Sequence, residues 1–369
     1  MIKVLVITHE LSLSGAPKSL LYTFSEIKNN SNSSITFDVL SLKKDAGLEN
    51  QFKGLSSCIY YFEPKKEALS KRNLIKKVLS RKRVSDAFLS IDEISNYDII
   101  YANTIVSLKL AIQLVKKKKT KLILHIHELN TVLNEFVSNL NDYDSFIDRY
   151  IVPSYMNQNC LVDNFNISVD KISVIRETTE LVFAEPKTKN NIEKFNVLMC
   201  GGAYWRKGDD IFIQVAKLVV DKNPNVNFYW VGYQSDERSR VNQLDIDNLE
   251  LKNHVFFVGQ TNTPNDWLPM MDLFFLSSRE DPFPLAAIEA GLYGIPICCF
   301  DKATGISEVI QEKELIAPYL DLNKMAEIIL TKSHERVDFS ERQKEVFKSF
   351  NVSNIASQTK ELIYSVAKL

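Results

Sequence analysis

Short apolar runs that alternate with longer helix-like stretches are the feature that most constrains the fold of this chain. Each run holds five to eight residues and is flanked by turn-forming residues. Continuous apolar runs of this length are typical of buried parallel strands, with helices covering both faces of the sheet. The predicted strands are 3–8, 36–42, 58–62, 98–102, 121–126, 149–153, 171–175, 196–200, 225–232, 254–259, 272–278 and 295–300.

A polar, proline-bearing segment at 176–195 interrupts this alternation and reads as a linker. The 369 residues suit two domains of ordinary size. We therefore expect an α/β chain of two βαβ domains with parallel sheets. The predicted units are a first domain at 1–178, a linker at 179–195, a second domain at 196–350 and a closing helix at 351–369 that returns toward the first domain.

Net charge, cysteine spacing and the length of the apolar stretches limit the partners and the compartment that we expect for this chain. Forty-five basic and 46 acidic side chains give a net charge of −1, so charge makes no case for a nucleic-acid partner. The five cysteines have no C-x-x-C spacing, which argues against a disulfide framework and favours a reducing compartment. No apolar stretch reaches 18 residues, so we expect a cytoplasmic protein without a spanning segment.

Two glycine-bearing turns lie where a strand gives way to a helix. Gly15 and Ala16 open one helix, and a helix start presents free backbone N–H groups to an anion. In "GGAYWRKGDD" (201–210), Arg206 and Lys207 precede a glycine and two aspartates that suit a helix N-terminus. The cations could clamp a diphosphate, but neither a P-loop nor a dinucleotide fingerprint is present. A glycine turn with solvated charges explains either stretch equally well.

The stretch "SREDPFPLAAIEAGLYGIP" (278–296) has a proline-stiffened loop followed by a small-residue helix. The alanines allow the helix to approach the sheet closely, and Gly294 ends it. Asp281 lies in the loop and Glu289 lies about two turns into the helix. Acidic side chains at the carboxyl end of a strand can accept hydrogen bonds from ribose or sugar hydroxyls.

His125 and His127 in "HIHE" lie on one face if the strand at 121–126 extends to them. A metal site needs a third ligand, and no spacing suggests one. A hydrogen-bonded histidine at a strand end is the simpler interpretation. His127 with Glu128 resembles a polar pair exposed where catalysis or substrate binding takes place.

The order of these motifs resembles glycosyltransferase family 4, which has the GT-B fold and an E-x7-E motif. Asp281 stands seven residues before Glu289, in the place of the first Glu of the motif, with Glu280 as the second choice. "IIYANT" (99–104), "HVFFVG" (254–259) and "ATGISEVI" (303–310) follow the family order, and the resemblance is strongest over 196–310.

The resemblance implies a retaining transferase that moves a sugar from a UDP- or GDP-sugar to a hydroxyl of a glycan or lipid-linked acceptor, in bacterial surface polysaccharide biosynthesis. It implies no cofactor and no metal. The implied catalytic residues are His127, Lys207, Asp281 and Glu289. The implied donor-binding residues are Gly15, Ala16, Arg206, Lys207, Asp281, Phe283, Pro284, Leu285 and Glu289. The implied acceptor-side residues are His9, Asn103 and Glu128.

One departure leaves alternatives open. Many members of the family carry an arginine five or six residues before the lysine, where this chain has Gly201 and Gly202. Arg206 is the candidate replacement. Another GT-B enzyme, such as a nucleotide-sugar epimerase or a phosphorylase, and an inactive nucleotide-binding relative remain as alternatives.

The segment 64–84 carries nine Lys or Arg and one Glu, with an apolar stripe at helical spacing. A basic amphipathic helix is typical of binding at an anionic membrane surface. We therefore expect peripheral attachment at the inner face of the plasma membrane through this segment. The alternative is an ordinary solvated helix.

Overall fold

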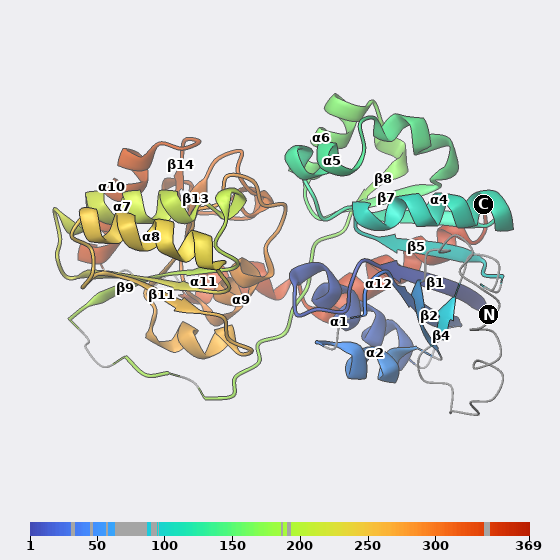
Figure 1. Cartoon of the computed structure of the whole chain (residues 1–369), viewed down its shortest axis with the longest axis horizontal. Coiled ribbons are helices and arrows are strands. Elements are labelled where there is room, and N and C mark those ends of the chain that lie inside the picture. The colour runs from blue at the N-terminus through green and yellow to red at the C-terminus, as the bar shows by residue number, and fades with distance from the viewer. Residues whose placement is uncertain are drawn as a thin grey trace, which may run out of the picture.

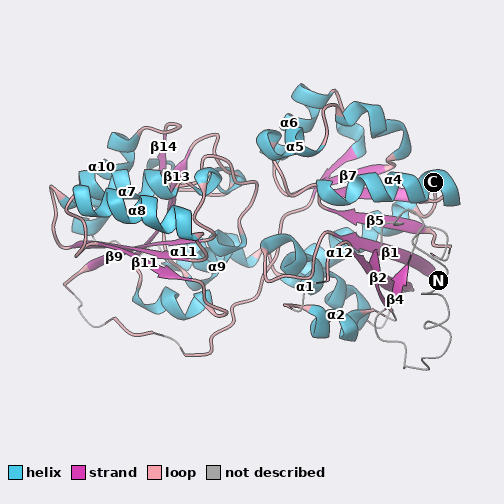
Figure 2. Cartoon of the chain, viewed as in Figure 1, coloured by secondary structure: helices cyan, strands magenta, loops and turns pink. Residues whose placement is uncertain are grey.

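The computed structural model describes residues 1–30, 34–44, 47–56, 58–62, 87–89, 94, 96–185, 187–189, 193–335 and 340–369. The chain forms two α/β bodies, each with a sheet covered by helices on both faces (Figures 1 and 2). The basic segment 64–84 lies outside the described residues, so its predicted membrane role stays a prediction. Within the described part of the chain, no helix has both the length and the apolar character needed to cross a bilayer.

The first sheet has eight strands in the order β4-β3-β2-β1-β5-β6-β7-β8, all paired in parallel. Its strands are β1 (Ile2–Thr8), β2 (Ile35–Ser41), β3 (Ile59–Phe62), β4 (Ala87–Leu89), β5 (Ile99–Asn103), β6 (Lys121–His125), β7 (Arg149–Val152) and β8 (Ile172–Val174). The order reverses at β1 and β5, and ligands bind beyond the carboxyl ends of the strands at such a point.

The second sheet has six parallel strands in the order β11-β10-β9-β12-β13-β14. They are β9 (Phe195–Cys200), β10 (Val226–Val231), β11 (Val255–Gly259), β12 (Leu273–Leu276), β13 (Ile297–Phe300) and β14 (Ile316–Ala317). Strand β9 is fully buried, as expected for a central parallel strand. The order of this sheet reverses between β9 and β12, so the two turns that follow these strands lie side by side.

The helices fill the crossovers. They are α1 (Gly15–Asn29), α2 (Glu49–Leu55), α4 (Leu108–Lys118), α5 (Asn130–Phe136), α6 (Tyr155–Phe165), α7 (Asp209–Val220), α8 (Asp236–Asn248), α9 (Leu285–Tyr293), α10 (Leu322–Glu335), α11 (Ser340–Lys348) and α12 (Val352–Val366). The last helix, α12, follows the second domain in sequence but packs on α1 of the first, where Ile355 and Ile363 join the core.

The predicted fold class is confirmed, and each predicted strand has a counterpart within a few residues. Strands β4 and β14 were not predicted because they are only three and two residues long and carry no measurable periodicity. Helix α9 ends as predicted at Gly294, whose φ of 99° lies in the left-handed region.

Candidate functional site

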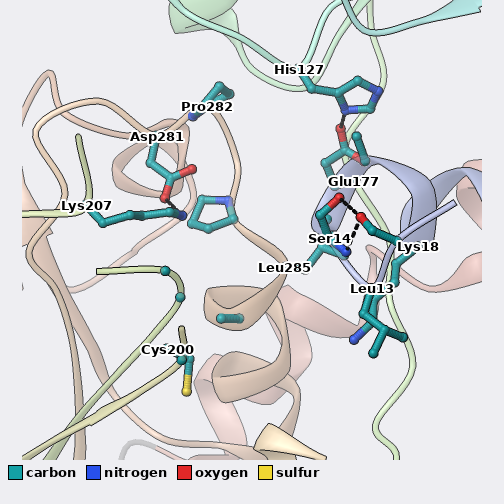
Figure 3. A pocket seen from close by; sticks show the side chains of 18 of the residues that line it. Leu13, Ser14, Lys18, His127, Glu177, Cys200, Lys207, Asp281, Pro282 and Leu285 are labelled. Carbon is teal, nitrogen blue, oxygen red and sulfur yellow. Dashed lines mark hydrogen bonds and ion pairs between the residues drawn. The ribbon is translucent and has the colours of Figure 1, made fainter. Parts of the chain in front are cut away.

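A cleft of about 600 Å³ lies between the two domains, at the carboxyl ends of both sheets. All of the predicted site residues except Asn103 line it. Figure 3 shows Lys207 and Asp281 of the second domain on one side of the cleft, with His127 and Glu177 of the first domain on the other. The cleft thus has a C-domain wall, which is built on β9–β14, and an N-domain wall, which is built on β1–β8.

Lys207 is placed by the turn between β9 and α7. A single 3-10 turn, Trp205–Lys207, ends at Gly208, which has φ +70° and precedes the first residue of α7. A Cβ at Gly208 would stand 2.2 Å from the carbonyl oxygen of Ser277, so only glycine fits this close crossing of two turns. The crossing brings Lys207, which is buried apart from 9% of its surface, next to the turn after β12.

Asp281 is the partner of Lys207 in that second turn. Its backbone N–H donates to the Ala303 carbonyl (2.8 Å), and the Ser278 hydroxyl donates to Oδ2 (3.2 Å). Lys207 Nζ forms a short ion pair with the same oxygen. The wall thus holds a buried cation and a buried carboxylate that satisfy each other.

Arg206 adds a second cation to this wall. Its guanidinium lies 3.6 Å from Asp281 Oδ1 and donates to the Glu280 carbonyl (2.8 Å). Burial alone would lower the pKa of Arg206, but the Asp281 carboxylate raises it above its ordinary value. The Tyr204 ring, under this guanidinium, occupies the space beside Gly202, where a Cβ would meet it at 2.6 Å. Arg206 thus lies on the C-domain wall beside Asp281, and its replacement of the arginine missing at Gly201 and Gly202 stays a prediction.

Glu289 is a second buried carboxylate of the same wall, and its oxygens accept hydrogen bonds from neutral groups. It projects from α9 and is buried apart from 7% of its surface. The Thr179 hydroxyl donates to Oε1 (3.0 Å), and the Asn265 amide, oriented to satisfy both of its groups, donates to Oε2 (3.0 Å). Burial raises the pKa of Glu289 to about 7, although Lys18 and the Thr179 hydrogen bond act in the opposite direction. Both carboxylate oxygens can accept hydrogen bonds from hydroxyl groups, and these hydrogen bonds are strongest when the carboxyl is ionised.

The N-terminus of α1 meets the start of α9 across the cleft. A Cβ on Gly15 would stand 3.7 Å from Leu285, so the two helix starts approach closely. Gly15, Ala16, Phe283, Pro284 and Leu285 all line the cleft at this point. Helix α1 has no side-chain cap at its N-terminus, which leaves its first N–H groups available to an anion.

The N-domain wall is centred on His127, with His9 and Glu128 beside it. Glu128 Oε2 accepts from the backbone N–H groups of His127 (2.9 Å) and Ile105 (3.3 Å), which fixes the loop after β6. Asn103 is fully buried behind the ring, and its Oδ1 stands 2.7 Å from His127 Nε2. Asn103 can therefore act on a ligand only through His127.

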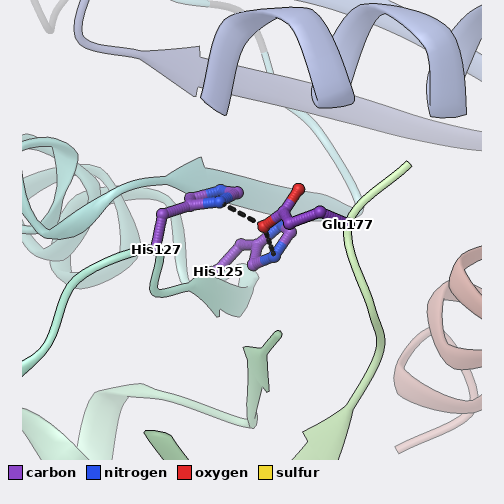
Figure 4. A group of neighbouring side chains, drawn as sticks. All are labelled: His125, His127 and Glu177. Atoms are coloured by element: carbon purple, nitrogen blue, oxygen red, sulfur yellow. Dashed lines mark hydrogen bonds and ion pairs between the residues drawn. The ribbon is translucent and has the colours of Figure 1, made fainter. Parts of the chain in front are cut away.

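Glu177 is the residue of this wall that sequence reasoning missed. Its Oε1 lies 2.6 Å from His127 Nδ1 and 3.7 Å from His125 Nε2 (Figure 4). Burial alone would raise the pKa of Glu177, but His127 lowers it to about 2. No local pattern could have identified Glu177, because it lies 50 residues beyond His127, in the segment that the sequence marks as the start of the linker.

The possible metal-ligand atoms of His125, His127 and Glu177 lie within 4.8 Å of one another. Among the described residues, this is the one group of His, Cys, Asp or Glu side chains that is close enough together to hold a metal ion. Two ligand atoms of a tetrahedral zinc ion stand roughly 3.4 Å apart, given bond lengths of about 2.0–2.2 Å. His127 Nδ1 and Glu177 Oε1 are closer than that and share a hydrogen bond. The geometry is that of an ion pair.

Glu280 points away from the cleft, unlike its neighbour Asp281. Its Oε1 accepts from the Thr131 backbone N–H (3.0 Å) in the first turn of α5. Glu308 makes a similar contact with α6, where it accepts from Tyr155 (3.1 Å) and Met156 (2.8 Å). These two carboxylates of the second domain hold the helix N-termini of the first domain, a favourable charge arrangement.

Residues 183–346 match the family model "Glycosyl transferases group 1". The match covers less than half of the chain. The matched residues contain β9–β14 and the side chains Arg206, Lys207, Asp281 and Glu289 of the C-domain wall. The match thus falls on the half of the molecule in which Lys207, Asp281 and Glu289 converge.

Two relatives and one solved structure extend the comparison. The chain is 25% identical over 163 residues to an uncharacterized glycosyltransferase of Haemophilus influenzae (39% of this chain, 46% of the relative). It is 28% identical over 282 residues to an uncharacterized 41.2 kDa protein in the cps region of Klebsiella pneumoniae (69% and 74%). The match thus spans under half of the first relative.

The structure of Anabaena HepE in complex with UDP and glucose superposes with a TM-score of 0.77 at 18% identity, covering 99% of this chain and 100% of HepE. At this identity the likeness concerns the fold, and it shows that the two parallel-sheet domains are arranged as in the GT-B fold.

Proposed function

We propose that the protein is a retaining glycosyltransferase that moves a sugar from a UDP- or GDP-sugar to a hydroxyl of a glycan or lipid-linked acceptor. The observation that carries the proposal is the C-domain wall. One buried cation, Lys207, one partly exposed cation, Arg206, and two buried carboxylates converge there on one cleft, within the residues that match the glycosyl transferases group 1 model. Cations suit a diphosphate, and carboxylates suit the hydroxyls of ribose and sugar.

The proposed donor site assigns one task to each group. Lys207 and Arg206 bind the diphosphate, and the open N-terminus of α1 adds its N–H groups. Glu289 accepts hydrogen bonds from the ribose hydroxyls, and Asp281 accepts hydrogen bonds from hydroxyls of the donor sugar. Lys207 and Asp281 are paired with each other, so donor binding exchanges part of that contact for contacts to phosphate and sugar.

In the proposed reaction the bond between the anomeric carbon and the phosphate oxygen breaks, and the acceptor oxygen bonds to the same carbon from the same face. The nucleoside diphosphate leaves with the electron pair of the broken bond. Negative charge grows on its oxygen, where Lys207 and Arg206 stabilise it. The acceptor hydroxyl passes its proton to the departing phosphate, so the protein supplies no nucleophile, and no metal or cofactor is assigned to the reaction.

The N-domain wall, with His9, His127 and Glu128, is the proposed acceptor side. A relative encoded in a cps region supports a role in bacterial surface polysaccharide biosynthesis, and HepE, solved with UDP and glucose, supports a nucleotide-sugar donor. We place the protein in the cytoplasm, attached to the inner face of the plasma membrane through the basic segment 64–84.

Product analysis tests the activity. The protein is incubated with UDP- and GDP-sugars, with and without a polyprenyl-diphosphate glycan, and products are followed by NMR of the anomeric proton. We expect acceptor-dependent release of nucleoside diphosphate and a product with the anomeric configuration of the donor. An inverted product would contradict retention. Conversion of the nucleotide-sugar without any acceptor would identify an epimerase, and nucleotide binding without turnover would identify an inactive relative.

A further inference from the structure

His127 is held between two hydrogen-bond acceptors. Glu177 Oε1 lies 2.6 Å from Nδ1, and Asn103 Oδ1 lies 2.7 Å from Nε2. The orientation of the Asn103 amide has its own support, because its Nδ2 donates to the Ala16 carbonyl (3.4 Å) and leaves the oxygen toward His127. A neutral imidazole has one N–H and one lone pair, so it satisfies only one of two acceptors, whereas an imidazolium satisfies both.

We propose that Glu177 is a positioning residue that keeps His127 doubly protonated, with Asn103 as the acceptor of the second N–H, so that His127 presents a positive charge and no base to the cleft. The inference deepens the proposed function, on which its catalytic consequence rests. The protonation state itself follows from the contacts of the unliganded chain.

The groups around the His127 ring favour a single positive charge on the pair of His125 and His127. The His125 ring is tilted by 35° against the His127 ring, with centroids 3.8 Å apart, and its Nδ1 is 2.7 Å from the Tyr101 hydroxyl. Burial, followed by the charge of His127, holds the pKa of His125 well below its ordinary value, so His125 is neutral. The two neighbouring histidines, which share one carboxylate, thus carry a single positive charge.

The other titratable groups that face His127 lie on several helices, strands and loops. His9, in the loop after β1, opposes the charge on His127, whereas Glu128 supports it. Arg206 of the opposite wall acts on Glu128. Burial alone would lower the pKa of His127, but Glu177 and then Glu128 raise it above its ordinary value. These carboxylates therefore favour the ionised form of the buried pair of His127 and Glu177.

The effect of pH on the reaction depends on which of the two ring protons His127 loses first. The Glu177 carboxylate is the stronger acceptor, so Nδ1 keeps its proton and Nε2 loses its own as the pH rises. Below the raised pKa, both ring N–H groups are bonded to Glu177 and Asn103, and the ring that lines the cleft carries a positive charge. Above that pKa, Nε2 loses its proton and the ring is neutral. Activity that needs this charge is therefore complete at lower pH and falls as the pH rises through the pKa of His127.

NMR of the histidine ring nitrogens in the full-length, unliganded protein tests the proposal without any activity measurement. His127→Gln assigns the resonance. We expect both ring nitrogens of His127 to be protonated at pH 7.5 in the wild type. Glu177→Gln removes the charge and should lower the pKa of His127 by about 1–3 units. Asn103→Asp adds a carboxylate on the other side and should raise it.

Glu128→Gln is the matched control, because Glu128 contacts the backbone of His127 and not its ring. It should lower the pKa of His127 by less than Glu177→Gln does. A wild-type His127 with one unprotonated nitrogen at pH 7.5 overturns the proposal, and so does an equal shift in Glu177→Gln and Glu128→Gln. The wild-type spectrum decides the question even if a variant fails to fold.

The pH dependence of sugar transfer gives the second measurement. The alkaline limb of kcat/KM should move to lower pH in Glu177→Gln by the same shift that NMR reports, with the rate recovered on the acidic side. Glu177→Asp, which keeps the charge, should restore much of the alkaline limb. A loss of rate that is equal at every pH would show a purely structural role. Absence of transfer in all proteins would contradict the proposed function and leave the NMR result intact.

Discussion

The two walls of the cleft hold their charges in different ways. On the N-domain wall, His127 and Glu177 belong to one domain, and both ring nitrogens already have acceptors. On the C-domain wall, Lys207 and Asp281 come from neighbouring turns and neutralise each other, while Glu289 is buried with neutral donors around its oxygens. The N-domain wall is preorganised, whereas the C-domain wall must exchange partners when an anion or a polyol binds. Substitutions on the C-domain wall should therefore act on donor binding and on its pH dependence, and those on the N-domain wall on the pH dependence of the transfer rate.

Lys207→Ala should have the largest effect, because it removes the cation that faces the leaving phosphate. We expect the rate of transfer to fall by roughly 10²–10³-fold, in the range for loss of one electrostatic stabiliser. Lys217→Ala is the matched control, since Lys217 lies on the surface of α7 and pairs with Asp221. Thermal unfolding of both variants checks the fold. Near-normal turnover in folded Lys207→Ala would contradict the assignment.

Asp281→Ala should come next, with a loss of roughly 10- to 100-fold from missing charged hydrogen bonds to the donor sugar. Glu280→Ala, one residue away, should cost much less, because Glu280 binds the N-terminus of α5 and does not line the cleft. Steady-state kinetics of the two variants, side by side, separates them. The reverse order would mean that Glu280 is the sugar-binding carboxylate.

Glu289 should make donor binding depend on pH. With a pKa of about 7, the carboxylate is mostly protonated at pH 6 and mostly ionised at pH 8. If the ribose hydroxyls bind the ionised form, affinity for a nucleotide-sugar should be about ten-fold higher at pH 8 than at pH 6. Calorimetric titration measures this, and Glu289→Gln should abolish the difference. A wild-type affinity independent of pH would exclude Glu289 from the ribose site.

The same raised pKa predicts a change in stability. The folded chain binds the Glu289 proton more tightly than the unfolded chain, whose pKa is near 4.5. The free energy of unfolding therefore falls as the pH rises from about 4.5 through 7, by about 2–4 kcal/mol for this group. Glu289→Gln, which cannot ionise, should be more stable than wild type at pH 8 and similar to it at pH 5. Denaturant unfolding at both pH values checks the sign.

Chelation should have the smallest effect. We expect the rate to be unchanged in excess EDTA, because cations of the protein face the phosphates and the His127–Glu177 contact is too short to enclose an ion. A loss of activity that Mg²⁺ or Mn²⁺ restores would contradict this prediction and would reopen the three-residue group as a metal site.

The contrast between the walls also explains how much the sequence could reveal. The C-domain wall rests on two local patterns, each a strand, a turn and a helix, and such patterns are readable one turn at a time. Lys207, Asp281 and Glu289 could therefore be named in advance. That Lys207 and Asp281 would pair could not, because the contact joins residues 74 positions apart.

The N-domain wall was less accessible to sequence reasoning. His127 stood out at a strand end, but its protonation depends on Asn103 and Glu177, which lie on separate segments. Glu177 has no helical or strand period around it, since it follows β8 in irregular backbone. The different directions of Glu280 and Asp281 also depend on tertiary contacts, namely α5 for the first and Ala303 for the second.

Binding of a nucleotide-sugar to the C-domain wall is the central claim, and calorimetric titration tests it most directly. Wild type, Lys207→Ala and Lys217→Ala are each titrated at pH 8 with a panel of UDP- and GDP-sugars. We predict that wild type and Lys217→Ala bind the same member of the panel with equal affinity and that Lys207→Ala binds it at least about ten-fold more weakly. Equal affinity in all three proteins, or binding of no nucleotide-sugar by the wild type, would contradict the account.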